Sequence, residues 1–322
     1  MKDNTVSPTT TPNLESLRLE DSILLPEVPE NGIMSKMASN VTFYEGMTED
    51  EEDAIWESRR LGTGHHQRQL SFSLPEDMQA VNRHATDLFK SLAQRVVTTY
   101  QSRKDDLQNG QLFIAVAGGP GSGKSTLCEK VAQRVNARLE PGIAVVLPMD
   151  GFHYSRESLR KMAETEACVY TYEQLLQRRG APWTFDHDLC AEKFKQARHH
   201  GEGSFPVYSR EKSDPVPDGV QLMMTHKIVF LEGNYLLAWD DPNWSSLQGV
   251  FDEAWYVACT TLEEQRERLI NRHLSNWTEE KIQMWGEGHI GAGRKADSND
   301  VLNSAWIDHH SRKHADLIVE SK

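Results

Sequence analysis

Cysteine is scarce in this chain, and its spacing is not that of a disulfide or zinc framework. Four cysteines occur among 322 residues, and no two of them form a CxxC pair. Long apolar runs are missing too: no stretch approaches the roughly 18 residues of a membrane span, and residues 1–4 begin no apolar signal core. These absences favour a reducing compartment and no membrane partner, so we expect a cytoplasmic protein, with the nucleus as an alternative.

Basic charge is deficient as well, and the deficit is unevenly placed. The formal net charge is −13, and residues 1–60 hold thirteen acidic against five basic side chains. These residues thus carry −8, and the other 262 carry −5. The body of the chain lacks the basic excess of nucleic-acid-binding proteins, so we expect no nucleic-acid partner.

Residues 1–72 differ in composition from the rest of the chain. They contain a Pro/Thr tract at 7–12 and an acidic run at 49–53, and such segments bury too little apolar surface to fold. We predict an acidic, disordered leader that could dock a protein partner. The folded domain should span 73–322 and begin with a capping box, in which Ser73 and Glu76 satisfy free amides at a helix start.

Strands and helices alternate from residue 111 onward. Continuous apolar runs typical of buried parallel strands occupy 112–117, 143–147 and 227–231, and further strands are expected at 253–258 and 317–319. The segments between these strands show the apolar spacing typical of amphipathic helices. The alternation predicts an α/β fold, a five-stranded parallel sheet with helices on both faces and ligands at the carboxyl ends of the strands.

One glycine-rich segment carries the strongest chemical signal. It follows the first apolar strand, precedes a helical pattern and matches the P-loop motif GxxxxGK[ST]: Gly118-Gly119-Pro120-Gly121-Ser122-Gly123-Lys124-Ser125. Its glycines let backbone amides converge on an anion, and the following helix adds its positive dipole. We expect Lys124 to reach the β- and γ-phosphates of ATP, Ser125 to ligate Mg²⁺, and Thr126 to bind the α-phosphate.

The ends of the other strands narrow the class of P-loop NTPase. The chain has no NKxD guanine-binding motif, and its third strand ends in Glu232-Gly233 rather than the Asp-Glu of many transport and motor ATPases. Asp150 follows the second strand, where a carboxylate can accept a proton from a hydroxyl that attacks the γ-phosphate. A turn or a helix cap is the competing interpretation, since Asp-Gly is common in turns.

The motifs together resemble those of the phosphoribulokinase/uridine kinase superfamily, especially a branch with a yeast ATP-dependent kinase and bacterial relatives of pantothenate kinase. Besides 118–126, the matching segments are 147–153, 178–186, 214–217, 232–237, 268–273 and 299–300. The resemblance covers about residues 80–322. It implies a five-stranded parallel core, a mobile helical lid, and transfer of the γ-phosphoryl group of ATP to an alcohol on a small molecule.

The same resemblance assigns roles to individual residues. Asp150 corresponds to the family's proposed catalytic base, and Glu232 to its Walker B carboxylate near Mg²⁺. Arg268 and Arg272 correspond to lid arginines that neutralise phosphate charge. Taken alone, arginines four residues apart more commonly form a solvated helix face, here paired with Glu264 and Glu267. Asn299 falls in a segment near the adenine.

The residues around the expected acceptor have more than one interpretation. Arg178 and Arg179 could bind an anionic substrate or cap a helix C-terminus, and the aromatic residues after them could wall a pocket or pack in the core. The chain reads Val207-Tyr208-Ser209-Arg210 where the family has an aromatic-Asp-Arg segment, which leaves the acceptor open. The candidate substrate contacts are His153, Tyr154, Arg178, Arg179, Trp183, Phe185, Asp186, Tyr208 and Arg210.

Two functions follow from these patterns. The first is an ATP- and Mg²⁺-dependent small-molecule kinase, whose acceptor is a nucleoside, a sugar or sugar acid, or a pantothenate-like alcohol. The second is an ATP-binding regulator that hydrolyses ATP slowly and switches a protein partner. The set of Lys124, Ser125, Asp150 and Glu232 favours the enzyme, because a protein that only binds ATP needs no base.

Deletion of residues 1–72 tests the predicted domain boundary. Because the leader is expected to contribute no core, the shortened chain should keep its cooperative thermal unfolding transition and its ATP turnover. Circular dichroism and an ADP-release assay measure these two properties. Loss of the unfolding transition would show that the folded domain begins before residue 73.

Overall fold

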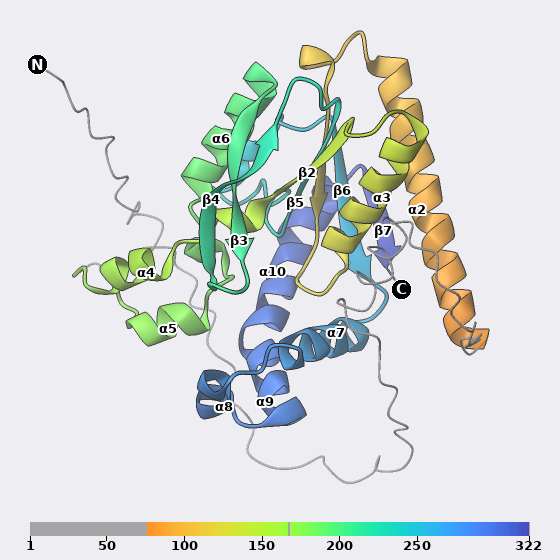
Figure 1. Ribbon diagram of the computed structural model, residues 1–322. Helices are drawn as coiled ribbons and strands as arrows, with labels where there is room; N and C mark the ends of the chain where they lie inside the picture. Colours follow the sequence, from red (N-terminus) through yellow and green to blue (C-terminus); the bar gives the residue numbers. More distant parts are fainter. Residues whose placement is uncertain (1–75, 167, 322) are drawn as a thin grey trace, which may run out of the picture. The chain divides into compact units, whose positions relative to one another are not determined.

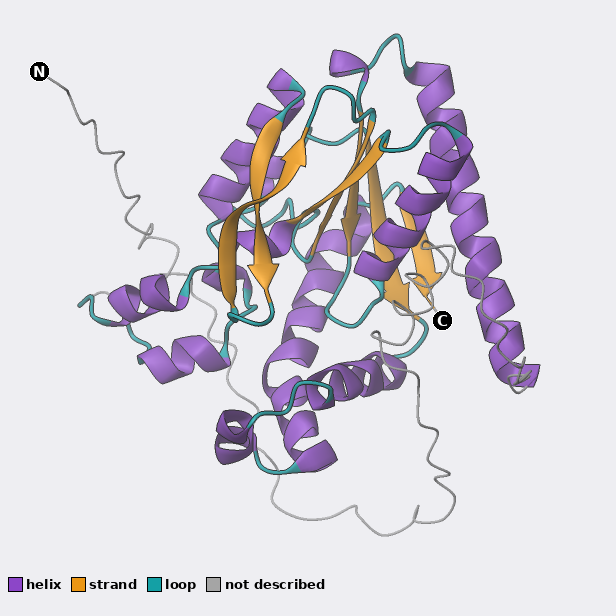
Figure 2. Cartoon of the chain, in the orientation of Figure 1, coloured by secondary structure: helices purple, strands orange, loops and turns teal. Residues whose placement is uncertain are grey.

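A five-stranded parallel sheet between two layers of helices forms the core of the described chain (Figures 1 and 2). The computed structural model describes residues 76–166 and 168–321, with side chains from residue 85 onward. Residues 1–72, with the predicted docking leader, and the expected cap at Ser73 lie outside the described residues. Within those two described ranges, no helix is both long and apolar enough to span a membrane.

The sheet has the strand order β2-β5-β1-β6-β7, and every neighbouring pair is parallel. Its strands are β1 (Leu112–Ala117), β2 (Ala144–Pro148), β5 (Ile228–Gly233), β6 (Glu253–Cys259) and β7 (Leu317–Ser321). All five predicted strands are therefore confirmed, with ends that shift by no more than two residues. The predicted fold class is confirmed with them.

Side chains alternate between the two faces of the central strand β1, as its pleat requires. Leu112, Ile114 and Val116 belong to a buried cluster with helices α2 (Glu76–Arg103) and α3 (Lys124–Arg138). Phe113 and Ala115 point the other way, into a cluster with α6 (His187–His200) and α10 (Val301–Ser311). Burial on both faces explains why these strands read as continuous apolar runs.

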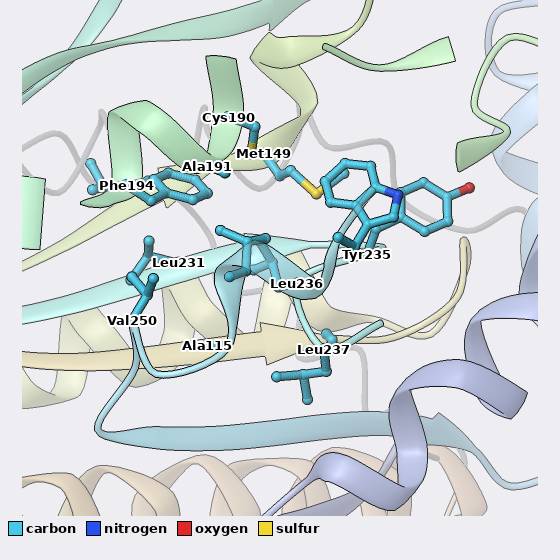
Figure 3. Packing of buried hydrophobic residues seen from close by; sticks show 14 of the residues in the cluster. Ala115, Met149, Cys190, Ala191, Phe194, Leu231, Tyr235, Leu236, Leu237 and Val250 are labelled. Atoms are coloured by element: carbon cyan, nitrogen blue, oxygen red, sulfur yellow. The ribbon is translucent and has the colours of Figure 1, made fainter. Parts of the chain in front are cut away.

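Figure 3 shows part of the buried cluster on the α6 side of the sheet. Figure 3 shows Met149 and Tyr235, which follow β2 and β5, among apolar side chains of the core. Both residues are fully buried. The loops that leave the sheet are thus anchored in its core within a few residues of the strand ends, which limits how far they can move.

An antiparallel hairpin, which the strand predictions omitted, packs against the turn that follows β2. It consists of β3 (Gly203–Ser209) and β4 (Asp214–Leu222). Pro206, Pro215 and Pro217 interrupt its sequence, and proline is uncommon inside strands because it donates no ladder hydrogen bond. The hairpin forms a separate two-stranded sheet, in which these prolines are tolerated.

The predicted lid is a group of short helices after β6. It comprises α7 (Leu262–Leu274), α8 (Glu279–Trp285) and α9 (Gly288–Lys295), followed by a π-helical turn at Ala296–Asp300. Leu269 and Ile270 of α7 pack against Ala292 and Ala296 to form a small core of their own. Two further short helices, α4 (Arg156–Ala163) and α5 (Tyr172–Gln177), lie near the hairpin end of the site (Figure 1).

Gly151→Ala tests the close packing of the segment after β2 on the hairpin. A Cβ atom at Gly151 would clash with the carbonyl oxygen of Pro206, a backbone atom that cannot rotate away. We expect the free energy of unfolding to fall by about 1–3 kcal/mol, the usual effect of overpacking. Urea denaturation measures the change. Gly203→Ala is the matched control, because its Cβ would lie 3.4 Å from the Phe205 ring, an ordinary contact. Equal losses in both variants would contradict the argument.

Candidate active site

The register of the sheet brings the chemical residues to one edge. Glu232 of β5 lies opposite Val116 of β1 on one side and Pro148 of β2 on the other. The P-loop begins directly after β1, and Asp150 comes two residues after β2. Because the three strands are parallel and adjacent, the P-loop, Asp150 and Glu232 meet beyond their carboxyl ends, as ligand sites do in α/β sheets.

The P-loop backbone has the conformation that only glycine adopts easily. Gly121 has φ of 78° and Gly123 has φ of 86°, both in the left-handed region. A Cβ at Gly119 would also lie 2.7 Å from the Ser304 hydroxyl oxygen of α10. The loop thus wraps tightly before α3 begins at Lys124, with that helix's free amides facing the loop.

Lys124, Ser125 and Glu232 form the polar centre of the site. Lys124 Nζ lies 3.5 Å from Glu232 Oε1, and Ser125 Oγ donates a hydrogen bond of 3.1 Å to the same oxygen. Burial raises the pKa of Glu232; the positive charge of Lys124 opposes the rise, and the negative charge of Asp150 adds to it. Mg²⁺ prefers oxygen ligands, and the Glu232 carboxylate and the Ser125 hydroxyl lie in contact with each other. These two residues therefore fit the expected metal.

Asp150 is held by a short 3₁₀ turn, Met149–Phe152, at the end of β2. The ring of His153 braces this turn: its Nδ1–H donates to the Asp150 carbonyl oxygen over 2.7 Å. The ring lies between Phe185, at 3.9 Å, and Tyr208, at 5.0 Å between centroids. Burial lowers the pKa of His153, more than the neighbouring Asp150 raises it. A neutral His153 therefore orients the backbone that carries the candidate base.

The two neighbouring arginines have different environments. The Arg179 guanidinium donates to Ser213 O at 2.6 Å, Tyr154 O at 2.7 Å and Asp214 Oδ1 at 2.7 Å. It braces the hairpin against the loop, and its contact with the substrate stays a prediction. Arg178 instead donates from Nη1 to the carbonyl oxygen of Ser298, at 2.9 Å.

The loop after the arginines is largely structural. Phe185 is fully buried among Tyr235 and Trp244, and the Asp186 carboxylate caps α6 by accepting a hydrogen bond of 3.0 Å from Leu189 N. Both residues were predicted as acceptor contacts. The contacts of Phe185 are those of core packing, the competing interpretation, and acceptor binding by Asp186 stays a prediction. Trp183 stacks on Tyr170 with centroids 5.1 Å apart.

Three further candidates lie around this loop. Tyr154 is buried, and burial raises the pKa of its hydroxyl, helped by the charges of Asp186 and Asp188. Tyr208 faces His153 and carries the Arg179 guanidinium over its ring, at 5.3 Å. Arg210 lies exposed at the turn between β3 and β4. Of these three side chains, Tyr208 is the one that packs near His153, whose ring holds the backbone of Asp150.

The two lid arginines are also unlike each other. Arg268 Nη2 pairs with Glu264 at 2.5 Å, and its Nη1 donates to Ser321 Oγ at 3.1 Å, next to the position a Cβ of Gly123 would take. Arg268 therefore lies beside the P-loop. Arg272 is exposed. Its positive charge contributes to the electrostatic environment of Asp300, which pairs with His273 in a largely buried contact of 2.6 Å between nitrogen and oxygen.

Asn299 lies in the π-helical turn, and its contacts are with the arginine loop. Its Nδ2 donates to Arg179 O at 2.9 Å, while Tyr235 Oη donates to Gly180 O at 2.5 Å. The role of Asn299 near the adenine stays a prediction. Tyr235 was missed as a site residue, although it belongs to the segment 232–237 that carries part of the family resemblance. Gln265 was missed as well: its Nε2 donates to the P-loop carbonyl of Pro120 at 2.7 Å.

The sequence of this chain is similar to those of known proteins. A model of the family described as "Phosphoribulokinase / Uridine kinase family" matches residues 113–249. The Schizosaccharomyces pombe protein C227.14, provisionally named a uridine kinase, is 33% identical over 203 residues, which are 62% of this chain and 78% of the relative. The uncharacterised protein YggC of Escherichia coli is 35% identical over 167 residues, 50% of this chain and 62% of the relative.

Solved structures agree with the fold. A Silicibacter sp. TM1040 structure, provisionally described as a fructose transport system kinase, has a TM-score of 0.58 at 29% identity, and the match covers 72% of this chain and 98% of that one. YFH7 of Saccharomyces cerevisiae also has a TM-score of 0.58, at 21% identity, over 73% of this chain and 99% of its own.

Glu232→Gln tests whether this carboxylate supports a divalent cation. The amide keeps the size of the side chain but removes the charge that attracts Mg²⁺. We expect the affinity for ATP with Mg²⁺ to fall about 10- to 100-fold, and the affinity for ATP with EDTA to change little. Isothermal calorimetry with a non-hydrolysable ATP analogue measures both. The metal role is refuted if the two affinities fall together.

Proposed function

Since this chain belongs to the phosphoribulokinase/uridine kinase family of P-loop kinases, we propose that it transfers the γ-phosphoryl group of ATP to an alcohol group of a small molecule. The observation that carries the proposal is the convergence of Lys124, Glu232 and Asp150 at the ends of three adjacent strands. A protein that only bound nucleotide would need the first two residues and not the third.

Each residue of this set has a defined task in phosphoryl transfer. The P-loop amides and Lys124 hold the phosphates, and Ser125 with Glu232 would hold Mg²⁺, which supplies positive charge to the phosphates when bound. Arg268, beside the P-loop, adds charge on the lid side. Catalysis of this kind consists chiefly of positioning and electrostatic stabilisation, and all these groups sit on rigid elements or on their ends.

Asp150 is the proposed general base. Its carboxylate orients the acceptor hydroxyl and takes its proton as the oxygen attacks phosphorus. The brace from His153, and the packing of the following Gly151 on the hairpin, fix the backbone from which the carboxylate projects. The candidate acceptors remain a nucleoside, a sugar or sugar acid, and a pantothenate-like alcohol.

Asp150→Asn is the direct test. The amide keeps the shape of the side chain and loses its ability to accept a proton, so turnover should fall about 100-fold or more, the usual range of general base catalysis. The affinity for ATP should stay nearly unchanged, because Asp150 holds no phosphate. ADP release with an acceptor panel measures turnover, and calorimetry measures ATP binding.

The control is Asp105→Asn, which alters an exposed carboxylate near the end of α2 and should leave both quantities unchanged. Unchanged turnover of Asp150→Asn on an acceptor that the wild type phosphorylates would refute the role of Asp150. If no member of the panel raises ATP consumption above the rate with water, the ATP-dependent regulator becomes the better account.

A further inference from the structure

The first turn of the lid helix α7 contacts the backbone of the P-loop through the side chain of Gln265. Resting on the proposed function, we propose that Gln265 is a positioning residue of the nucleotide site. Its carboxamide fixes the peptide group between Pro120 and Gly121, so that the Gly121 N–H faces the phosphates of ATP. In this role Gln265 acts through the loop and does not bind ATP itself.

The Gln265 carboxamide is buried and donates two hydrogen bonds. Its Nε2 donates to Pro120 O at 2.7 Å and to Ser304 Oγ of α10 at 3.1 Å. A carbonyl oxygen can only accept, so the nitrogen of the carboxamide, and not its oxygen, must face the loop. Ser304 Oγ donates its own proton to Asp300 O at 2.9 Å, which leaves its lone pairs for Gln265. The two N–H groups of the carboxamide thus have one acceptor each.

The part of the P-loop that Gln265 binds is a tight turn at residues 119–122. Ser122 N donates to Gly119 O at 3.1 Å, and Gly121 has φ of 78°. Proline in the second position and a glycine of positive φ in the third are the pattern of a type II turn. A type I turn has the same closing hydrogen bond with its central peptide flipped, so this bond alone does not select the orientation. The bond from Gln265 to Pro120 O does, because it holds the central peptide itself.

The orientation of this peptide decides where the Gly121 N–H points. In a planar trans peptide the C=O and the N–H point in opposite directions. Since Pro120 O is directed at α7, the Gly121 N–H is directed away from α7, toward the side on which P-loop amides converge on phosphate. Within residues 76–166 and 168–321, the Gly121 N–H donates to no backbone carbonyl. This donor therefore remains available for a phosphate oxygen.

The glycines of the P-loop allow α7 to come close enough for this contact. A Cβ atom at Gly119 would lie 2.8 Å from Gln265 Nε2, and one at Gly121 would lie 2.9 Å from Leu269 Cγ. Gln265 and Leu269 are four residues apart, so they lie on the same face of α7. The loop and the helix are thus in direct contact over one helical turn.

The helix turn that carries Gln265 is itself fixed. Thr261 caps α7, since its Oγ1 accepts a hydrogen bond of 3.1 Å from Glu264 N. Gln265 N donates to Thr261 O at 3.2 Å, and the Gln265 side chain is held from α10 by Ser304. A carboxamide fixed at its backbone and at its end can hold a peptide group in one orientation, which is what preorganised phosphate binding requires.

Gln265→Leu tests the proposal on the full chain. Leucine has nearly the size of glutamine and no charge, but it has no N–H for Pro120 O. We expect the Kd of a non-hydrolysable ATP analogue with Mg²⁺ to rise about 10- to 100-fold, the typical contribution of one hydrogen bond to a charged group. Isothermal titration calorimetry measures the Kd, and thermal unfolding of the free protein shows whether the variant is folded.

Gln111→Leu is the matched control. Gln111 is also fully buried, and its Nε2 donates to two carbonyls, Gly201 O at 2.9 Å and His226 O at 2.8 Å. It directly precedes β1, whereas the P-loop follows that strand, so the two lie at opposite ends of the sheet. Gln111→Leu should lower the melting temperature without changing the Kd of the ATP analogue. The comparison separates a loss of stability from a loss of phosphate positioning.

Ser304→Ala is a second, milder variant. It removes the hydroxyl that holds the Gln265 carboxamide from α10 but leaves the bond to Pro120 O possible. The Kd of the ATP analogue should therefore rise by a smaller factor, about 2- to 10-fold, as for the loss of one neutral hydrogen bond. This variant decides the question if Gln265→Leu does not fold.

Three results would overturn the positioning role. They are wild-type affinity in a folded Gln265→Leu, an equal loss of affinity in Gln111→Leu, and, where Gln265→Leu does not fold, wild-type affinity in Ser304→Ala. The measurements need no acceptor, so they are independent of phosphoryl transfer. A chain that phosphorylates no acceptor but shows the expected affinities would refute the kinase function alone, and a wild type that binds no ATP would refute both.

Discussion

The site depends on holding charges of both signs close together where water is largely excluded. Lys124 and Glu232 are buried 3.5 Å apart, and the negative charge of Asp150 acts on the same carboxylate. Two carboxylates in such a place repel each other, and only nearby positive charge makes the arrangement stable. The parallel sheet provides this by ending three adjacent strands at one edge, with a helix N-terminus directed at the same point.

The elements around the sheet serve to keep these groups in position. The hairpin of β3 and β4 packs so closely on the turn after β2 that Gly151 has no room for a Cβ atom. Arg179 ties this hairpin to the loop at 178–186, and Asn299 ties that loop to the π-helical turn. Hydrogen bonds thus connect the candidate base to the lid region through structural residues. The π-helical turn at Ala296–Asp300 interrupts regular helix geometry, and such turns are frequently found at functional sites.

The two adjacent arginines illustrate how neighbours in sequence come to differ in function. Both carry the same charge, and both follow the same short helix. Arg179 points to Asp214 and is neutralised there, whereas Arg178 donates to a carbonyl. Partial burial of a guanidinium is costly for the free protein, because desolvation penalises its charge.

The sequence by itself determined the fold class, the five core strands and the strand-end residues Lys124, Asp150 and Glu232. Those signals are local: apolar runs mark buried strands, and glycine spacing marks the P-loop. Only the tertiary structure shows the contacts of Arg178, Arg179 and Phe185, because their partners lie far away in the chain or in the core. The β3–β4 hairpin was likewise hidden, since its prolines mask the strand pattern and its pairing arises only from packing against the turn that carries Asp150.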